Sequence, residues 1–176
     1  LTIYAQDLMV AEQIDANNIS IDQEKNIIVK GLFNGTFDFD FSTNKAELTS
    51  SNAGLDSDHF LASYDSLLNF RWAFNFFGAI IGGNRSMLTD KLGNIYISDF
   101  AFDQVDFDPS PATAFLDNTA DGYGPFIAKY DNQGNFIWVK SYECKLIELI
   151  GKHFYGFYGS KMIKFDLNGQ IIWERQ

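Results

Sequence analysis

Five short segments of similar sequence interrupt the apolar runs of this chain. Each begins with Asp, whose carboxylate can accept hydrogen bonds from backbone N–H groups two residues on. Three of them carry Gly at the fourth position, where it tolerates a positive φ. A turn that recurs between strand-like runs indicates an internal repeat, and it predicts an all-β chain of similar antiparallel sheets. The five segments are Asp22–Asn26, Asp65–Asn69, Asp90–Asn94, Asp131–Asn135 and Asp166–Gln170.

Two long units and a shorter third unit align on these turns. Asn26–Val29 aligns with Asn94–Ile97, and Phe60–Asp65 aligns with Phe126–Asp131. Lys25 and Leu68 stand where the other turns have Gly, so strained or differently shaped turns are expected there. Each unit is expected to form four strands, at 17–21, 26–33, 58–65 and 69–76, then 84–89, 94–102, 125–130 and 135–142, and then 144–147, 153–158, 160–165 and 170–175.

Between their second and third strands, the first two units carry an insertion. Phe37–Phe41 and Val105–Asp108 alternate apolar and acidic residues, and after a turn Ala46–Leu48 and Ala114–Leu116 alternate again. Because alternation is typical of a strand with one buried face, an inserted hairpin is expected in each of these units. Gly78–Asn84, between the first and second units, is interpreted as a connector.

The second unit carries four features in a fixed order, and together they resemble the bacterial β-propeller repeats of large exported and surface proteins. The first unit departs from them with Phe41 in place of Pro and Leu68 in place of Gly. The resemblance implies a β-propeller-like fold of about three four-stranded antiparallel blades, and an extracellular or cell-surface location. The four features are the strand Asn94–Ile97, the insertion Asp106–Pro109, the strand Ile127–Asp131 and the closing Trp138.

On this basis, blade 1 is expected at 14–78 and blade 2 at 79–142, each with an inserted hairpin, and a short blade 3 at 143–176. Residues 1–13 are a candidate for the terminal strand of another blade. Propellers generally need about four blades or more to close. Three arrangements are therefore open: a piece of a longer propeller, a ring completed by further chains, or an open stack. A protein partner, or additional blades of the same protein, is expected in the first two.

The charge of the chain argues against two classes of partner. Its formal net charge is −10, from 23 acidic and 13 basic residues. Such a surface repels phosphate backbones and anionic lipid, so neither nucleic acid nor membrane insertion is expected. The single cysteine, Cys144, excludes an intrachain disulfide and a cysteine-based zinc site.

The acidic pairs Asp38/Asp40 and Asp106/Asp108 are the candidate metal site. Residues two apart on a strand share a face, so each pair presents two carboxylates together, and oxygen-rich clusters suit calcium. The alternative is that they form the solvated face of an amphipathic hairpin, which needs a polar face in any case. That alternative is preferred, and no other cofactor is expected.

Aromatic residues give the candidate ligand site. Trp72, Trp138 and Trp173 recur once per unit at the same strand position, which favours packing between neighbouring sheets over a stacking platform. The remaining cluster, Tyr123, Tyr155, Tyr158 and Phe77, is the better candidate for an exposed binding surface.

Enzymatic activity is not expected from these residues. His59 and His153 lie in different units, and Cys144 has no histidine near it in the sequence. The sequence therefore predicts a non-catalytic binding or structural module with a protein–protein or scaffold role. The alternative is a carbohydrate-binding or carbohydrate-active propeller that uses a site in the central channel, assembled from residues far apart in the sequence.

Overall fold

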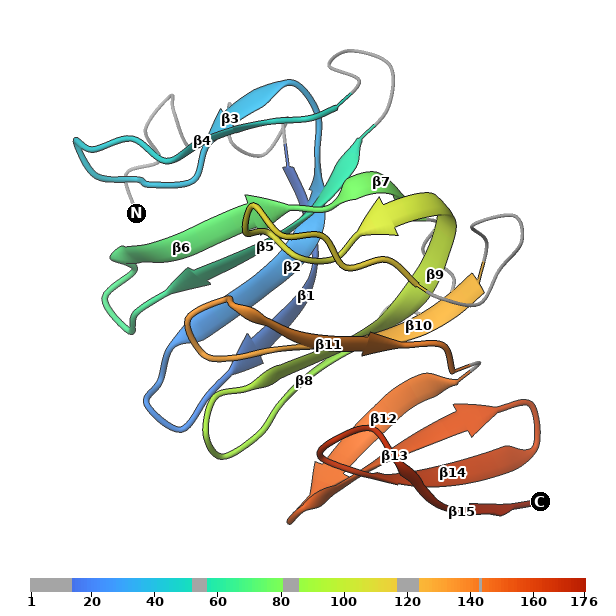
Figure 1. The fold of residues 1–176 in the computed structure, drawn as a ribbon. Coiled ribbons are helices and arrows are strands. Elements are labelled where there is room, and N and C mark those ends of the chain that lie inside the picture. The colour runs from blue at the N-terminus through green and yellow to red at the C-terminus, as the bar shows by residue number, and fades with distance from the viewer. Residues whose placement is uncertain (1–13, 52–56, 81–85, 117–123, 143) are drawn as a thin grey trace.

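A computed structural model describes residues 14–51, 57–80, 86–116, 124–142 and 144–176, and every regular element in these ranges is a β-strand (Figure 1). Within these ranges, no helix occurs that is long and apolar enough to cross a membrane. The strands are β1 (Ile14–Ile21), β2 (Ile27–Phe33), β3 (Thr36–Asp38), β4 (Glu47–Thr49), β5 (Asp58–Tyr64), β6 (Phe70–Asn75), β7 (Phe77–Ile80), β8 (Ser86–Thr89), β9 (Ile95–Asp106), β10 (Gly124–Tyr130), β11 (Phe136–Lys140), β12 (Lys145–Ile150), β13 (His153–Tyr158), β14 (Lys161–Asp166) and β15 (Ile171–Arg175).

Thirteen of the strands form three larger antiparallel sheets, which follow one another in chain order, and β3 and β4 form a separate two-stranded sheet. The first sheet has the order β1-β2-β5-β6 and the third has the order β12-β13-β14-β15. The second sheet has the order β11-β10-β9-β7, with β8 also paired to β9. The prediction of an all-β chain of similar antiparallel sheets is therefore confirmed. The sheets stack face to face and do not close into a ring within the described ranges (Figure 1).

The second sheet departs from the expected four-strand pattern at the edge that β7 and β8 form. The segment expected to be a connector contributes β7, which pairs with the later half of β9, while β8 pairs with the earlier half. Two short strands thus share one position beside a single long strand. Local sequence could not reveal this arrangement, because it depends on the unusual length of β9.

Only the first unit forms the predicted hairpin ladder, β3–β4. In the second unit, residues 107–116 contain no strand, so the hairpin predicted there is wrong. One bond of the hairpin remains, because Phe107 N–H donates to the Ala114 carbonyl, as Phe39 N–H does to that of Ala46. The prolines Pro109 and Pro111 lack the N–H groups that a longer ladder would require.

The repeated turns share one hydrogen-bond pattern. In the fourth turn, the Asp131 carboxylate accepts the backbone N–H groups of Gln133 at 2.8 Å and Asn135 at 2.9 Å. Gly134 has a φ of 81°, whereas Lys25 and Leu68 adopt φ values of 65° and 66° at the same turn position. These two residues therefore carry backbone strain, as predicted, in turns of unchanged shape.

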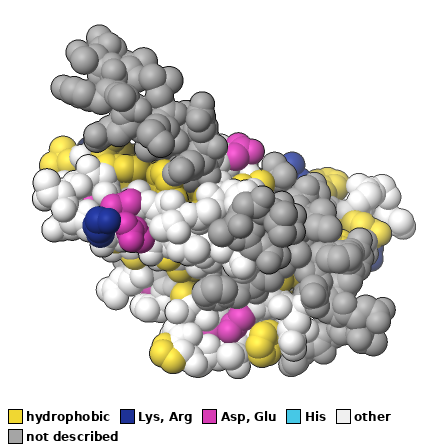
Figure 2. All heavy atoms as spheres, turned by 90° about the horizontal axis from the view of Figure 1, so that it is seen from above, with side chains coloured by type: hydrophobic (Ala, Val, Ile, Leu, Met, Phe, Trp, Pro, Cys, Tyr) yellow, Lys and Arg dark blue, Asp and Glu magenta, His cyan; other side chains and the backbone are white. Residues whose placement is uncertain are grey.

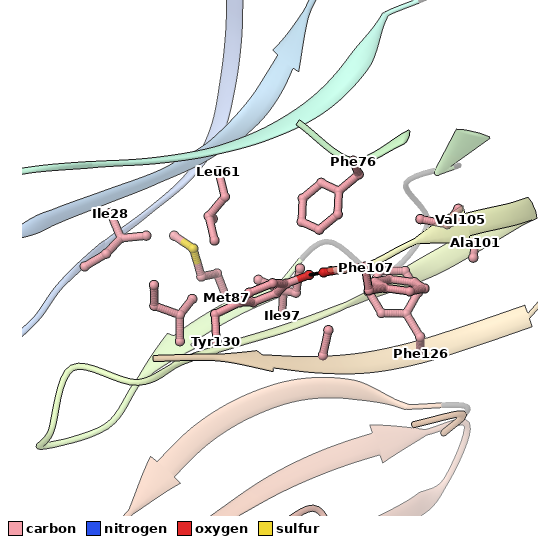
Figure 3. Close-up of a cluster of buried hydrophobic side chains, with 12 residues drawn as sticks. Ile28, Leu61, Phe76, Met87, Ile97, Ala101, Val105, Phe107, Phe126 and Tyr130 are labelled. Carbon is pink, nitrogen blue, oxygen red and sulfur yellow. Dashed lines mark hydrogen bonds between the residues drawn. The ribbon is translucent and has the colours of Figure 1, made fainter. Parts of the chain in front are cut away.

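Three clusters of buried hydrophobic side chains fill the spaces between neighbouring sheets. The first lies between the first and second sheets, where Ile28 and Leu61 face Met87, Ile97 and Tyr130 (Figure 3). The second lies between the second and third sheets, and the third lies between the first sheet and its inserted hairpin. Each sheet therefore depends on its neighbours for burial. The fully buried aromatic side chains in these cores include Phe33, Phe39, Phe60, Phe76, Tyr96, Phe107, Phe126, Tyr130, Phe154 and Phe165.

Buried tyrosines predict that the fold loses stability in alkali. Burial raises the pKa of the Tyr64, Tyr96 and Tyr130 phenols above the ordinary value of 10.0, and nearby carboxylates add to the shift. Because the folded pKa is the higher one, this stability is complete below pH 10 and is lost as the pH rises further. We expect these three phenols to ionise only together with unfolding, measured by tyrosinate absorbance and circular dichroism. Ionisation of all eight tyrosines near pH 10 in the folded chain would contradict this.

Candidate docking site on the third sheet

The strongest candidate site is the face of the third sheet that points away from the second. Because side chains alternate along a strand, Phe154, Ile163 and Phe165 point into the core shared with the second sheet, and their neighbours point the other way. We name this opposite side the third-sheet face. Lys164 pairs with Tyr155 on β13 and with Trp173 on β15, so these three stand side by side. Its residues are Tyr155, Phe157, Met162, Lys164, Trp173 and Arg175.

Cations and aromatic rings are interleaved on this face. The rings of Tyr155 and Trp173 meet edge to face, with centroids 6.2 Å apart and an interplanar angle of 61°. Lys164 Nζ lies 5.7 Å from the Tyr155 ring centroid, and Arg175 Cζ lies 4.9 Å from the Trp173 ring. Cations at these distances are attracted to the ring faces, which orients both charged side chains across the sheet.

The second sheet carries the same arrangement at the equivalent register positions. There, Tyr96 and Trp138 have ring centroids 6.2 Å apart at 60°. Lys129 Nζ lies 5.0 Å from the Tyr96 ring, and Lys140 Nζ lies 5.2 Å from the Trp138 ring. Tyr155, Lys164, Trp173 and Arg175 therefore repeat Tyr96, Lys129, Trp138 and Lys140, respectively.

In the second sheet this arrangement holds the β14–β15 turn of the third sheet. Lys129 Nζ donates to the Leu167 carbonyl at 3.0 Å, and Lys140 Nζ donates to the Asn168 carbonyl at 2.6 Å. The Tyr96 hydroxyl reaches the Leu167 carbonyl at 3.4 Å. Burial lowers the pKa of Lys129, and the carboxylates of Asp90 and Asp166 oppose that shift. The turn thus brings both its carbonyl oxygens and its Asp to the lysine.

A glycine completes each contact between sheets. Gly169 lies flat against Trp138, so that a Cβ added there would lie 2.8 Å from the ring. The first sheet makes the matching contact, because Trp72 packs on Gly134 and its indole N–H donates to the Asn132 carbonyl at 3.2 Å. The prediction that the tryptophans pack between sheets is confirmed for these two. Trp173 lies on the third-sheet face, which no further sheet covers within the described ranges.

The acidic pairs of the candidate metal site serve as backbone acceptors in their loops. Asp38 accepts the N–H groups of Asp40 at 3.1 Å and Ala46 at 2.8 Å. Asp106 accepts those of Asp108 at 3.1 Å and Ala114 at 2.9 Å. This use accounts for their recurrence in both insertions. Among the described residues, no group of three or more His, Cys, Asp or Glu side chains is placed to hold a metal ion.

The described residues among those predicted to form an aromatic surface lie in different parts of the fold. Tyr155 belongs to the third-sheet face, and Tyr158 ends the same strand with 47% of its surface exposed. Tyr123 lies outside the described residues, and Phe77 begins β7, in the second sheet. The sequence reasoning missed Lys129, Lys140, Lys164 and Arg175. A signal was present, because a basic residue stands two before the turn Asp and two after the Trp in both the second and third units.

Among the described residues, the two histidines and the cysteine lie in different parts of the fold. His59 lies in the first sheet and His153 in the third, and Cys144 is buried in the core between the second and third sheets. Burial raises the pKa of the Cys144 thiol to about 12, which suppresses the nucleophilic thiolate. In the view of Figure 2, the described hydrophobic side chains form several small patches, and a basic side chain lies directly against acidic ones.

A central-channel site would open at the turns that follow β1, β8 and β12. A shallow pocket there is lined by Asp22, Thr89, Asp90, Lys91 and Leu149, among others. The Asp22 and Asp90 carboxylates already accept hydrogen bonds within their own turns. Their chemistry is therefore that of turn formation.

No protein-family model matches the chain, and no curated protein matches it.

Proposed function

We propose that this chain is a non-catalytic structural and binding module of the β-propeller type, in a protein exported to or displayed on the bacterial cell surface. Its role is protein–protein contact or scaffolding. One observation carries the proposal: a tryptophan that recurs at the same strand position packs on the turn of the next sheet. The Trp–Gly contact occurs between the first and second sheets and again between the second and third.

Such an array works by nearest-neighbour contact, as in other repeat proteins. The export and cell-surface part of the proposal is supported by the resemblance of the second unit to bacterial β-propeller repeats. The net charge of −10 disfavours nucleic acid as a partner, which agrees with a protein–protein or scaffold role. The recurrent Asp residues are engaged in turns, which supports a scaffold over a catalytic role.

The rival to a scaffold role is carbohydrate binding, because exposed aromatic rings can stack on sugars. The test is a titration of the chain with a panel of soluble bacterial and plant polysaccharides, followed by tryptophan fluorescence and by assay for released reducing ends. We expect no saturable change and no turnover. A saturable signal that Tyr155→Ala abolishes, while the matched substitution Tyr158→Ala preserves it, would overturn the scaffold proposal and favour the carbohydrate-binding one.

A further inference from the structure

We propose that the third-sheet face binds a β-turn of the type Asp-x-x-Gly-Asn/Gln carried by a further repeat unit. The inference rests on the proposed function, and it names the partner that the face accepts. Its basis is a positional match, since Tyr155, Lys164 and Trp173 repeat Tyr96, Lys129 and Trp138, which hold such a turn.

The face is already shaped for this occupant. The Tyr–Trp ring pair has the same centroid distance, 6.2 Å, in the third sheet and in the occupied second sheet, and the interplanar angles are 61° and 60°. Side chains held in the bound geometry lose less entropy on binding, which favours association. The third-sheet face is therefore preorganised by its own sheet.

Three residues of the third-sheet face have an expected contact with the bound turn. By analogy with the second sheet, Lys164 would donate to the carbonyl of the second turn residue, as Lys129 does to Leu167. Arg175 would donate to the carbonyl of the third, as Lys140 does to Asn168. The Asp that opens the turn supplies charge complementarity, because Lys164 and Arg175 are both cationic. Trp173 would pack on the turn glycine.

A second copy of this chain does not supply that turn. We call the turns β5–β6, β10–β11 and β14–β15 the outer turns. The two that contain glycine already contact a tryptophan, because Gly134 packs on Trp72 and Gly169 packs on Trp138. The remaining outer turn has Leu68 at the glycine position. The Leu68 side chain would occupy the space that the indole ring of Trp173 needs. For comparison, a Cβ added to Gly134 would lie only 2.9 Å from the Trp72 ring. The occupant is therefore a repeat unit that has glycine in its turn.

The test extends the full chain with one more unit. A copy of residues 142–176 is fused directly after Gln176, where it repeats the connection from the second sheet to the third. The indole N–H of Trp173 is followed by NMR, and hydrogen exchange is followed in β15. We expect Trp173 to shift and β15 to become at least tenfold more protected than in the unextended chain. The matched control carries Gly169→Leu in the appended copy only, and it should give neither effect.

A cyclised hairpin peptide with the sequence of residues 162–173 provides a second probe for the unextended chain. We expect the peptide to shift the Trp173 indole signal, and the same peptide with Gly169→Leu to leave it unchanged. The proposal is overturned if neither the fusion nor the peptide perturbs Trp173, or if the glycine and leucine versions act equally. If neither probe perturbs Trp173 and no polysaccharide binds, this inference is wrong but the proposed scaffold function is still supported. Saturable polysaccharide binding would instead remove the proposed function.

Discussion

Replacing Asp99 with asparagine is expected to destabilise the fold by about 3–5 kcal/mol, the usual cost of leaving one charge of a buried pair without its partner. Lys30 Nζ on β2 donates to Asp99 Oδ2 on β9, and both side chains are fully buried. The pair therefore joins the first sheet to the second inside the largest apolar core. The free energy of unfolding, measured by urea titration, should fall without loss of the strand content seen by circular dichroism.

Two controls separate a buried charge from a general sensitivity to substitution. The double variant Lys30→Met with Asp99→Leu removes both charges, and we expect it to recover most of the lost stability. Lys161→Ala removes an exposed pair with Glu174, and a change within about 1 kcal/mol is expected. If Asp99→Asn changed stability no more than Lys161→Ala does, the buried pair would not be a determinant of sheet docking.

The second large effect is expected at Gly169. The variant Gly169→Ala combines a backbone φ of 72° with a Cβ only 2.8 Å from the Trp138 ring. Left-handed strain and overpacking together predict a loss of about 2–4 kcal/mol. The third sheet should loosen first, because Trp138 belongs to the contact that holds it. Hydrogen exchange would show this as faster exchange in β12–β15 than in β1–β6.

Matched substitutions separate the cost of backbone strain from the cost of overpacking against Trp138. Gly159 also has a positive φ, 57°, but no atom lies within 4 Å of an added Cβ, so Gly159→Ala reports backbone strain alone. We expect it to cost about 1–2 kcal/mol. In the opposite direction, Leu68→Gly removes strain at a side chain that is 59% exposed, and a gain of up to about 1 kcal/mol is expected. Equal losses for Gly159→Ala and Gly169→Ala would show that the Trp138 contact contributes nothing.

The strand content of this fold could be predicted, because the turns are local and their side-chain chemistry is explicit. Asp131 and Gly134 act within a single turn, so their roles are readable from spacing. β7 was not predictable in the same way, since its pairing depends on a long partner strand. The Lys30–Asp99 pair is less predictable still, because its residues belong to different sheets and no period in either strand indicates it.

The residues of the candidate site could likewise be predicted only in part from the sequence. Tyr155 was selected from the sequence as an exposed aromatic residue, whereas Lys164 and Arg175 were not. Their importance follows from what Lys129 and Lys140 do one sheet earlier, and those contacts cross from one sheet to another. The role proposed for the third-sheet face could be inferred only because the second sheet has the same residues in contact with a turn.

The two departures of the first unit have a consequence for how separate molecules behave. Beside the turn of the second unit lies a groove lined by Asp108, Pro109, Gln133 and Gly134, together with Trp72 of the first unit. The equivalent groove of the first unit is lined by Leu68 and by Phe41, whose ring stacks on that of Tyr64 with centroids 5.3 Å apart. Head-to-tail contacts between identical chains give a ring where the rotation between copies closes and an open filament where it does not. Because Leu68 stands at the position where Gly134 and Gly169 pack on a tryptophan, we expect the first unit to accept Trp173 of another copy poorly, which disfavours head-to-tail assembly of identical chains.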